Sequence, residues 1–202
     1  MASSTRVTRS ARRIVAVDGV DGSGKSQVAS ALAAACAAEG VAVTLLHVDD
    51  FRRDVDFAAL DAGAEAARYY DQYFDLAALD GALASFQAGS AGDAELAILE
   101  GVFTLRIPTV AASAALIVLT VSADEARRRI LARDRDKGRT DEEIERRMAR
   151  RYFPGQQRYR AEHDPEARAV AIVDNEDWQR PRVVRCIPGR LPAPVERWLT
   201  AL

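Results

Sequence analysis

Eight consecutive residues, 19–26 (GVDGSGKS), have the composition of a loop that binds phosphate. Glycine permits backbone conformations in which several N–H groups turn inward around an anion. In such a loop the lysine reaches the β- and γ-phosphates of a nucleoside triphosphate, and the next serine hydroxyl holds Mg²⁺. The residues predicted to contact the nucleotide here are Gly19, Asp21, Gly22, Ser23, Gly24, Lys25, Ser26 and Gln27. The alternative is a glycine-rich turn without a ligand.

Acidic residues follow two apolar runs further along the chain. Asp49 and Asp50 come after residues 41–48, and Glu100 comes after residues 96–99. Ligands of doubly wound sheets bind at the carboxyl ends of the strands, so these side chains are expected beside the loop. Glu100 suits a metal role and Asp49 suits a general base, with Asp50 the second candidate. The predicted metal ligands are Ser26, Glu100 and Asp49; the alternative for the Asp49-Asp50 pair is a helix cap or turn.

Arginines are concentrated between residues 127 and 139. Arg129 and Arg133 are four residues apart, so they share one face of a helix. With Arg139, which follows Gly138, they are positioned to fold over a nucleotide and stabilise charge on a transferring phosphoryl group. The glycine offers a place where a helical lid, about residues 129–153, could move. The alternative is a solvated face with acidic partners, which we prefer for Arg127, Arg128 and Arg135.

These side chains need a scaffold, and the hydrophobic pattern supplies one. Apolar runs typical of buried strands lie at 14–17, 41–48, 96–99, 115–121 and 169–173. Helical patterns lie between them, at 25–38, at 58–83 with an interruption near the aromatic residues, at 124–136 and from 140 onward. Ser122 or Asp124 is expected to cap the helix that runs towards Asp136, and Thr140 is expected to cap the next one. The first strand precedes the glycine-rich loop and a helix follows it, which is the context that a phosphate loop requires.

Alternating strands and helices predict an α/β fold, a doubly wound and mainly five-stranded parallel sheet with helices on both faces and a helical lid. The fold class predicted is that of P-loop NTPases. Residues 1–12 are predicted to be a flexible N-terminal arm, and residues 13–202 a single kinase-type domain. The proline-rich tail, residues 181–202, is expected to pack across the sheet edge.

The composition excludes several classes of protein. The chain has 202 residues, 49% hydrophobic and 29% charged, with a net charge of -2. This balance is typical of a soluble globular domain and gives no basic field for nucleic acid. No apolar run approaches the roughly 18 residues of a membrane span. The two cysteines suggest no disulfide framework, so a reducing cytoplasm is the predicted location.

Aromatic residues between positions 69 and 74 are candidates for an acceptor site, because they could stack a base or line a sugar pocket. Packing in the core is an equally good explanation for any one of them. The residues predicted to contact the acceptor are Asp50, Phe51, Tyr70, Asp71, Phe74, Arg129 and Tyr152. His47 lies within the second predicted strand, which favours a packed core histidine over a catalyst.

Several short motifs occur in a fixed order along the chain. They are 19–26 (GVDGSGKS), 48–51 (VDDF), 98–103 (ILEGVF), Arg129, Arg133-Asp134, Gly138-Arg139, 151–156 (RYFPGQ) and Asp174-Asn175. Together they resemble the uridine kinase/phosphoribulokinase family of P-loop kinases. The resemblance implies transfer of the γ-phosphoryl group of ATP to a hydroxyl of a small molecule, foremost a nucleoside. It implies that Asp49 is the base, that Ser26 and Glu100 serve Mg²⁺, and that Arg129, Arg133 and Arg139 belong to a lid.

The acceptor stays open at this stage. Tyr69, Tyr70 and Arg52 stand where nucleoside kinases of the family carry other residues, so phosphoribulose-, pantothenate- and sugar-type acceptors are alternatives. A nucleoside monophosphate kinase and a nucleotide-binding switch are further alternatives, although no Asn-Lys-x-Asp segment that reads guanine is present. The resemblance also implies a homo-oligomer, either a dimer or a tetramer.

Overall fold

A six-stranded sheet forms the centre of the protein, with strand order β2-β3-β1-β4-β5-β6. The computed structural model describes residues 12–202, so nearly all of the predicted N-terminal arm lies outside the described residues. The strands are β1 (Arg13–Gly19), β2 (Val43–His47), β3 (Leu96–Gly101), β4 (Ala115–Thr120), β5 (Ala171–Asp174) and β6 (Arg182–Cys186). The first five pair in parallel, which confirms the predicted parallel sheet.

Strand β6 is the one strand that the hydrophobic pattern does not predict. It pairs antiparallel with β5 at the sheet edge, and its residues alternate between exposed and half-buried positions. Helix α9 (Ala193–Thr200) then packs against α1 (Lys25–Ala38) through the same apolar core. The tail therefore does pack at the sheet edge, as expected from its position.

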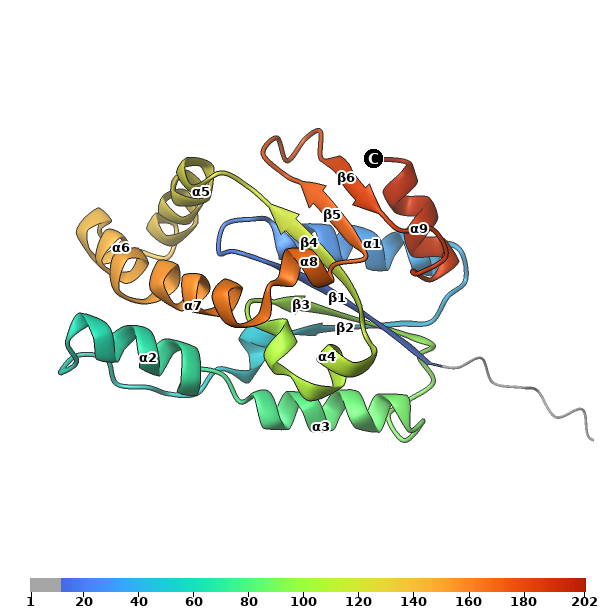
Figure 1. Cartoon of the computed structure of the whole chain (residues 1–202), viewed down its shortest axis with the longest axis horizontal. Helices are drawn as coiled ribbons and strands as arrows, with labels where there is room; N and C mark the ends of the chain where they lie inside the picture. The colour runs from blue at the N-terminus through green and yellow to red at the C-terminus, as the bar shows by residue number, and fades with distance from the viewer. Residues whose placement is uncertain (1–11) are drawn as a thin grey trace, which may run out of the picture.

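Helices cover both faces of the sheet (Figure 1). One face packs against α1 and α9, and the other packs against the aromatic-rich core of α2, α3, α4 and α7. The remaining helices are α2 (Ala62–Gln72), α3 (Leu76–Gln87), α4 (Pro108–Ser113), α5 (Ala123–Arg135), α6 (Asp141–Arg147), α7 (Phe153–His163) and α8 (Pro165–Arg168). A π-helical segment, Met148–Tyr152, joins α6 to α7. The α/β fold class is confirmed.

Short polar side chains set the starts of the helices. Ser122 and Thr140 accept hydrogen bonds from backbone N–H groups three residues on, at the N-termini of α5 and α6, as predicted. Asp61 and Asp75 do the same for α2 and α3. The cap at Asp75 explains the predicted interruption near the aromatic residues, because α2 ends at Gln72 and α3 begins at Leu76. Within residues 12–202, no helix has the length and apolar character that crossing a membrane requires.

The segments that carry Asp49 and Glu100 touch at Gly101. Val48 starts a short 3₁₀ helix, Val48–Phe51, and its side chain is fully buried. A Cβ atom at Gly101 would lie 2.4 Å from Cβ and Cγ2 of Val48. Only glycine allows this approach, so the contact fixes the 3₁₀ helix against the end of β3.

We expect Gly101→Ala to destabilise the fold by about 1–3 kcal/mol, because the added methyl group overpacks a closed contact. Urea unfolding followed by circular dichroism measures the change. The matched control is Gly81→Ala in α3, where a Cβ meets nothing within 4 Å. That variant should gain roughly 0.5–1 kcal/mol from helix propensity. Equal stabilities for the two variants would contradict the packing argument.

Candidate active site

The glycine-rich loop, residues 19–26, joins β1 to the N-terminus of α1. Gly22 and Gly24 have φ angles of 79° and 89°, in the left-handed region that favours glycine. Among the described residues no side chain caps the N-terminus of α1. Its first N–H groups and its dipole therefore point into the loop, as an anion site requires. The predicted strand, loop and helix context is present.

Lys25 is placed to serve a bound phosphate. Its side chain is buried, and Nζ donates a hydrogen bond of 2.8 Å to the carbonyl of Val20 within the same loop. The lysine thus holds the loop in its curved shape while its ammonium group stays at the loop mouth. In this position the ammonium group can release the carbonyl of Val20 and bind a phosphate oxygen instead.

Ser26 and Glu100 lie side by side at the mouth of the loop. Ser26 Oγ donates to Glu100 Oε1 at 3.0 Å, and Glu100 is largely buried at the end of β3. His47 Nδ1 lies 2.6 Å from the same carboxylate oxygen. Strand pairing sets this second contact, because His47 and Glu100 are partners in the β2–β3 register. His47 is half-buried and borders the site, so the expectation of a packed core histidine was wrong.

The oxygen atoms at this position fit magnesium. Mg²⁺ prefers oxygen ligands and is usually bound through one or two protein groups together with phosphates and water. Ser26 and Glu100 supply such oxygens beside the phosphate loop. Within residues 12–202 there is no group of three or more histidine, cysteine, aspartate or glutamate side chains suited to holding an ion by itself.

Asp49 lies just beyond the end of β2, the strand next to β3. Its side chain is 61% exposed, and Oδ2 accepts a hydrogen bond of 2.8 Å from Arg52 Nη2. A carboxylate that is open to solvent and held by one arginine is accessible to an incoming hydroxyl. Asp50, next along the chain, is also exposed, and Phe51 packs partly into the core.

Tyrosines from two helices meet the phosphate loop at Asp21. Tyr69 donates to Asp21 Oδ2 at 3.2 Å, and Gln156 Nε2 donates to the same oxygen at 2.6 Å. The ring of Tyr69 lies 5.4 Å from that of Tyr73 and 5.5 Å from that of Tyr152. Burial, together with the charge of Asp21, raises the pKa of Tyr69 well above its usual value. These tyrosines, which we call the tyrosine cluster, lie between the loop and Asp49.

Three predicted acceptor residues face elsewhere. Tyr70 is buried and donates to Glu162 Oε2 at 2.7 Å. Asp71 forms an ion pair with Arg158, and Phe74 is buried against Phe103. Tyr70 and Phe74 are buried, so neither side chain is open to an acceptor, and Phe74 packs instead against Tyr69 and Tyr73. Asp71 is 42% exposed, so its contact with an acceptor stays a prediction.

Helix α5 brings arginines to the loop from the opposite side. Arg129 Nη1 donates to the carbonyl of Gly22 at 3.4 Å, and Nη2 donates to the carbonyl of Asn175 at 2.8 Å. Arg133 donates through Nε to the buried Asp134 at 2.8 Å. Arg139 pairs with the other oxygen of Asp134 at 3.0 Å. Arg133 thus borders the loop, whereas the phosphate contact of Arg139 stays a prediction.

A cavity of about 380 Å³ separates α5 from the phosphate loop. Its lining residues are Gly22, Gly24, Lys25, Ser26, Gln27, Arg128, Arg129, Ala132, Arg133 and Trp178. Six of the predicted nucleotide residues are therefore brought together around one space. The charge of the lining is positive, which suits a polyphosphate.

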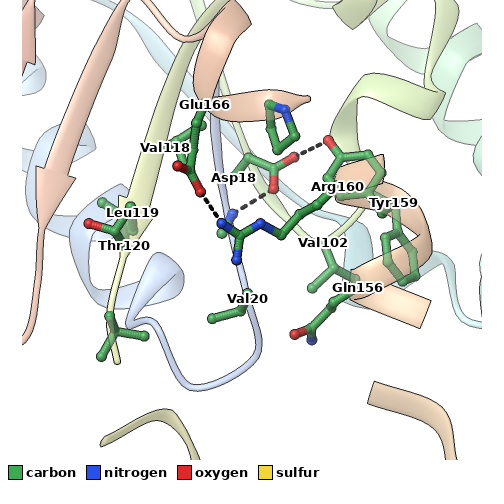
Figure 2. A pocket seen from close by; sticks show the side chains of 14 residues that line it. Asp18, Val20, Val102, Val118, Leu119, Thr120, Gln156, Tyr159, Arg160 and Glu166 are labelled. Atoms are coloured by element: carbon green, nitrogen blue, oxygen red, sulfur yellow. Dashed lines mark hydrogen bonds and ion pairs between the residues drawn. The ribbon is translucent and has the colours of Figure 1, made fainter. Parts of the chain in front are cut away.

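A second cavity, of about 270 Å³, lies under the loop between β1, β4 and α7 (Figure 2). Its wall includes the buried Asp18, whose carboxylate accepts hydrogen bonds from Tyr159 Oη at 2.6 Å and from the backbone N–H of Thr104 at 3.1 Å. Burial raises the pKa of Asp18 in spite of these bonds. The other oxygen accepts from Gly19 N–H, so Asp18 fixes the start of the phosphate loop.

Residues 15–150 match the family model described as an AAA domain. The chain belongs to the AAA domain family. No curated protein matches the sequence of this AAA domain at a significant level. The matched residues include the loop, Asp49, Glu100, α5 and α6.

Two solved structures share the fold of this AAA domain. A possible uridine kinase from Bacillus stearothermophilus aligns with a TM-score of 0.61 at 17% identity, over 83% of this chain and 91% of that chain. A candidate fructose transport system kinase from Silicibacter sp. TM1040 aligns with a TM-score of 0.58 at 21% identity, over 77% and 87%. The likeness confirms the predicted P-loop fold, and the predicted resemblance to uridine kinase-like P-loop kinases is confirmed.

Glu65, in α2, forms ion pairs with arginines of α6 and of the π-helical segment. Its side chain is fully buried in α2 and accepts from Arg151 Nε at 2.7 Å, from Arg146 Nη1 at 3.0 Å and from Arg150 Nη1 at 3.3 Å. Burial alone would raise the pKa of Glu65, but the hydrogen bond and charge of Arg151 and the other arginines lower it. One carboxylate therefore joins α2 to the end of α6 and to the π-helical segment.

We expect Glu65→Gln to cost about 2–3 kcal/mol of stability at neutral pH, because three arginines lose their common counter-charge. The native contribution is complete above the unfolded pKa and is lost as pH falls through the lowered folded pKa. As the pH is lowered, the stability of Glu65→Gln should therefore fall less than that of the native protein. Urea unfolding at several pH values measures this difference. Glu143→Gln, which removes a partly exposed pair with Arg147, is the control and should change stability by less than about 0.5 kcal/mol.

Proposed function

We propose that this protein is an ATP- and Mg²⁺-dependent kinase that transfers the γ-phosphoryl group to a hydroxyl of a small molecule. The observation that carries the proposal is that three groups of side chains lie around the phosphate loop. Ser26 and Glu100 lie 3.0 Å apart at its mouth, Asp49 follows the strand beside Glu100, and the tyrosine cluster reaches the loop through Asp21.

The residues of the candidate active site have distinct roles in phosphoryl transfer. Lys25 and the loop N–H groups bind the β- and γ-phosphates, and Arg129 and Arg133 stabilise charge on the moving group. Ser26 and Glu100 would hold Mg²⁺, which when bound would supply positive charge to the phosphate oxygens. Asp49 orients the acceptor hydroxyl and takes its proton as the oxygen attacks phosphorus in line with the departing ADP.

A nucleoside is the proposed acceptor to test first. Tyr73 and Tyr152, the half-buried members of the tyrosine cluster, offer ring faces for stacking and phenol groups for sugar hydroxyls. A sugar-, phosphoribulose- or pantothenate-type alcohol is the alternative, since Arg52 beside Asp49 could pair with an anionic group. A lid of residues 129–153, a homo-oligomer and a cytoplasmic location are parts of the same proposal.

ADP release tests the proposal. Purified protein with ATP and Mg²⁺ is offered a panel of nucleosides, sugar phosphates and pantothenate, and ADP is detected by a coupled assay. Release that depends on one class of acceptor supports the kinase and names the class. Hydrolysis that is independent of every acceptor would instead indicate a nucleotide-binding switch.

A further inference from the structure

Trp178 is the most exposed aromatic side chain among the described large hydrophobic residues, at 57%. The other tryptophan, Trp198, packs partly against the core between α1 and α9. Trp178 belongs to a tight turn in which the N–H of Arg180 donates to the carbonyl of Asp177 at 2.9 Å. A single exposed apolar ring is common on protein surfaces, so the informative feature of Trp178 is its position relative to the phosphate loop.

The segment that precedes Trp178 is fixed to the phosphate loop and to α5. Asn175 Nδ2 donates to the carbonyl of Ser23 at 2.7 Å, and Arg129 Nη2 donates to the carbonyls of Asn175 and Glu176 at 2.8 and 2.9 Å. The carboxylate of Glu176 accepts from Ser122 at the start of α5. These bonds hold the indole at a set position relative to the loop.

Trp178 lines the same cavity of about 380 Å³ as the phosphate loop. Arg128 and Arg129 of α5 line the same cavity. Arg128 is 66% exposed, and its guanidinium group donates to both carboxylate oxygens of Glu125, which holds its plane in one orientation. The tyrosine cluster contacts the loop at Asp21, which is not among the residues lining this cavity. The cavity thus belongs to the nucleotide rather than to the acceptor.

We propose that Trp178 stacks on the base of the nucleoside triphosphate whose phosphates occupy the loop. The indole covers one face of the base, and the guanidinium group of Arg128 covers the other. Every base offers a π-face, and an aromatic ring and an arginine both bind such a face well. The inference rests on the proposed function for its ligand, and it adds a residue that fixes the base end of that ligand.

The test compares a nucleotide with a ligand that lacks a base. In a Trp198→Phe background, Trp178 is the single tryptophan, and its fluorescence is followed during titration with ATP and with inorganic tripolyphosphate. Calorimetry gives both affinities independently. We expect ATP to quench the fluorescence, whereas tripolyphosphate binds without quenching.

The variant Trp178→Ala should weaken ATP binding by on the order of tenfold and leave tripolyphosphate binding unchanged. Trp178→Phe, which keeps a ring, should restore most of the lost affinity. Thermal unfolding should be alike in all variants, since the indole packs outside the core.

Unchanged ATP affinity in Trp178→Ala, or equal quenching by tripolyphosphate, would overturn the stacking role and leave the kinase proposal standing. Base-dependent quenching in a protein that phosphorylates no acceptor would support the stacking role and refute the kinase. Failure of both ligands to bind would overturn both.

Discussion

Lys25→Met is expected to lower the turnover of phosphoryl transfer by at least about 100-fold and to weaken the binding of ATP. Methionine keeps most of the volume of the buried side chain and removes the charge that faces the phosphates. Within residues 12–202, the ammonium group of Lys25 makes one hydrogen bond, from Nζ to the carbonyl of Val20. The ammonium group therefore contributes more to the ligand than to the fold.

Stability measurements separate these contributions. Losing the hydrogen bond from Lys25 to the carbonyl of Val20 costs about 1 kcal/mol. The unfolding temperature of Lys25→Met should therefore stay close to that of the native protein. Calorimetric titration with ATP and the coupled ADP assay give affinity and rate. A variant with native affinity and native rate would show that residues 19–26 do not hold the triphosphate.

Asp49→Asn is the second substitution with a large expected effect, a fall in kcat of about 10²–10⁴-fold with little change in ATP affinity. Asparagine keeps the size of the side chain and cannot take a proton. The carboxylate lies beside Arg52 and outside the cavity that carries the arginines of α5, so ATP binding should be spared. Steady-state kinetics on the acceptor found by the panel measure the effect.

Two matched variants sharpen this result. Asp54→Asn, the same change at an exposed position five residues on, should leave kcat unchanged. Asp50→Asn separates the two neighbouring aspartates, and we expect a much smaller effect than for Asp49. Near-native turnover of Asp49→Asn, or a larger loss at Asp50, would reassign the base.

The phosphate loop and the parallel strands could be predicted because each is encoded locally. Buried strands carry continuous apolar runs, and the loop needs its glycines at fixed spacing. Strand β6 escaped prediction because an edge strand needs no such run, and Arg182 and Arg185 interrupt it. Its pairing with β5 is a long-range property that the local pattern does not contain.

The sequence alone does not tell which aromatic residues of the segment 69–74 face the proposed acceptor site. A continuous helical pattern would place Tyr69 with Tyr73 and Tyr70 with Phe74 on separate faces, and the pattern does not tell which face meets the loop. Helix α2 instead ends at Gln72, and Phe74 lies beyond it in a single β-bridge with Arg52. Phe74 therefore packs against Tyr69 and Tyr73, whereas Tyr70 donates to Glu162.

The site contacts of His47, Gln156 and Trp178 were not predicted, for a related reason. His47 meets Glu100 through the β2–β3 register, and Gln156 reaches Asp21 from a helix 135 residues away in sequence. Trp178 lies in a turn with no motif of its own. A single tryptophan in a polar turn, such as residues 175–180, is nevertheless a sequence signal that could have found it.

The contact between Val48 and Gly101 limits which substitutions can be accepted at these two positions during evolution. Because the branched side chain of Val48 fills the space above Gly101, the two positions share a single volume. A larger residue at 101 becomes tolerable only with a smaller one at 48, so the pair should covary among relatives. An uncompensated substitution at either position would therefore change the separation of Asp49 and Glu100, which are the chain neighbours of Val48 and Gly101.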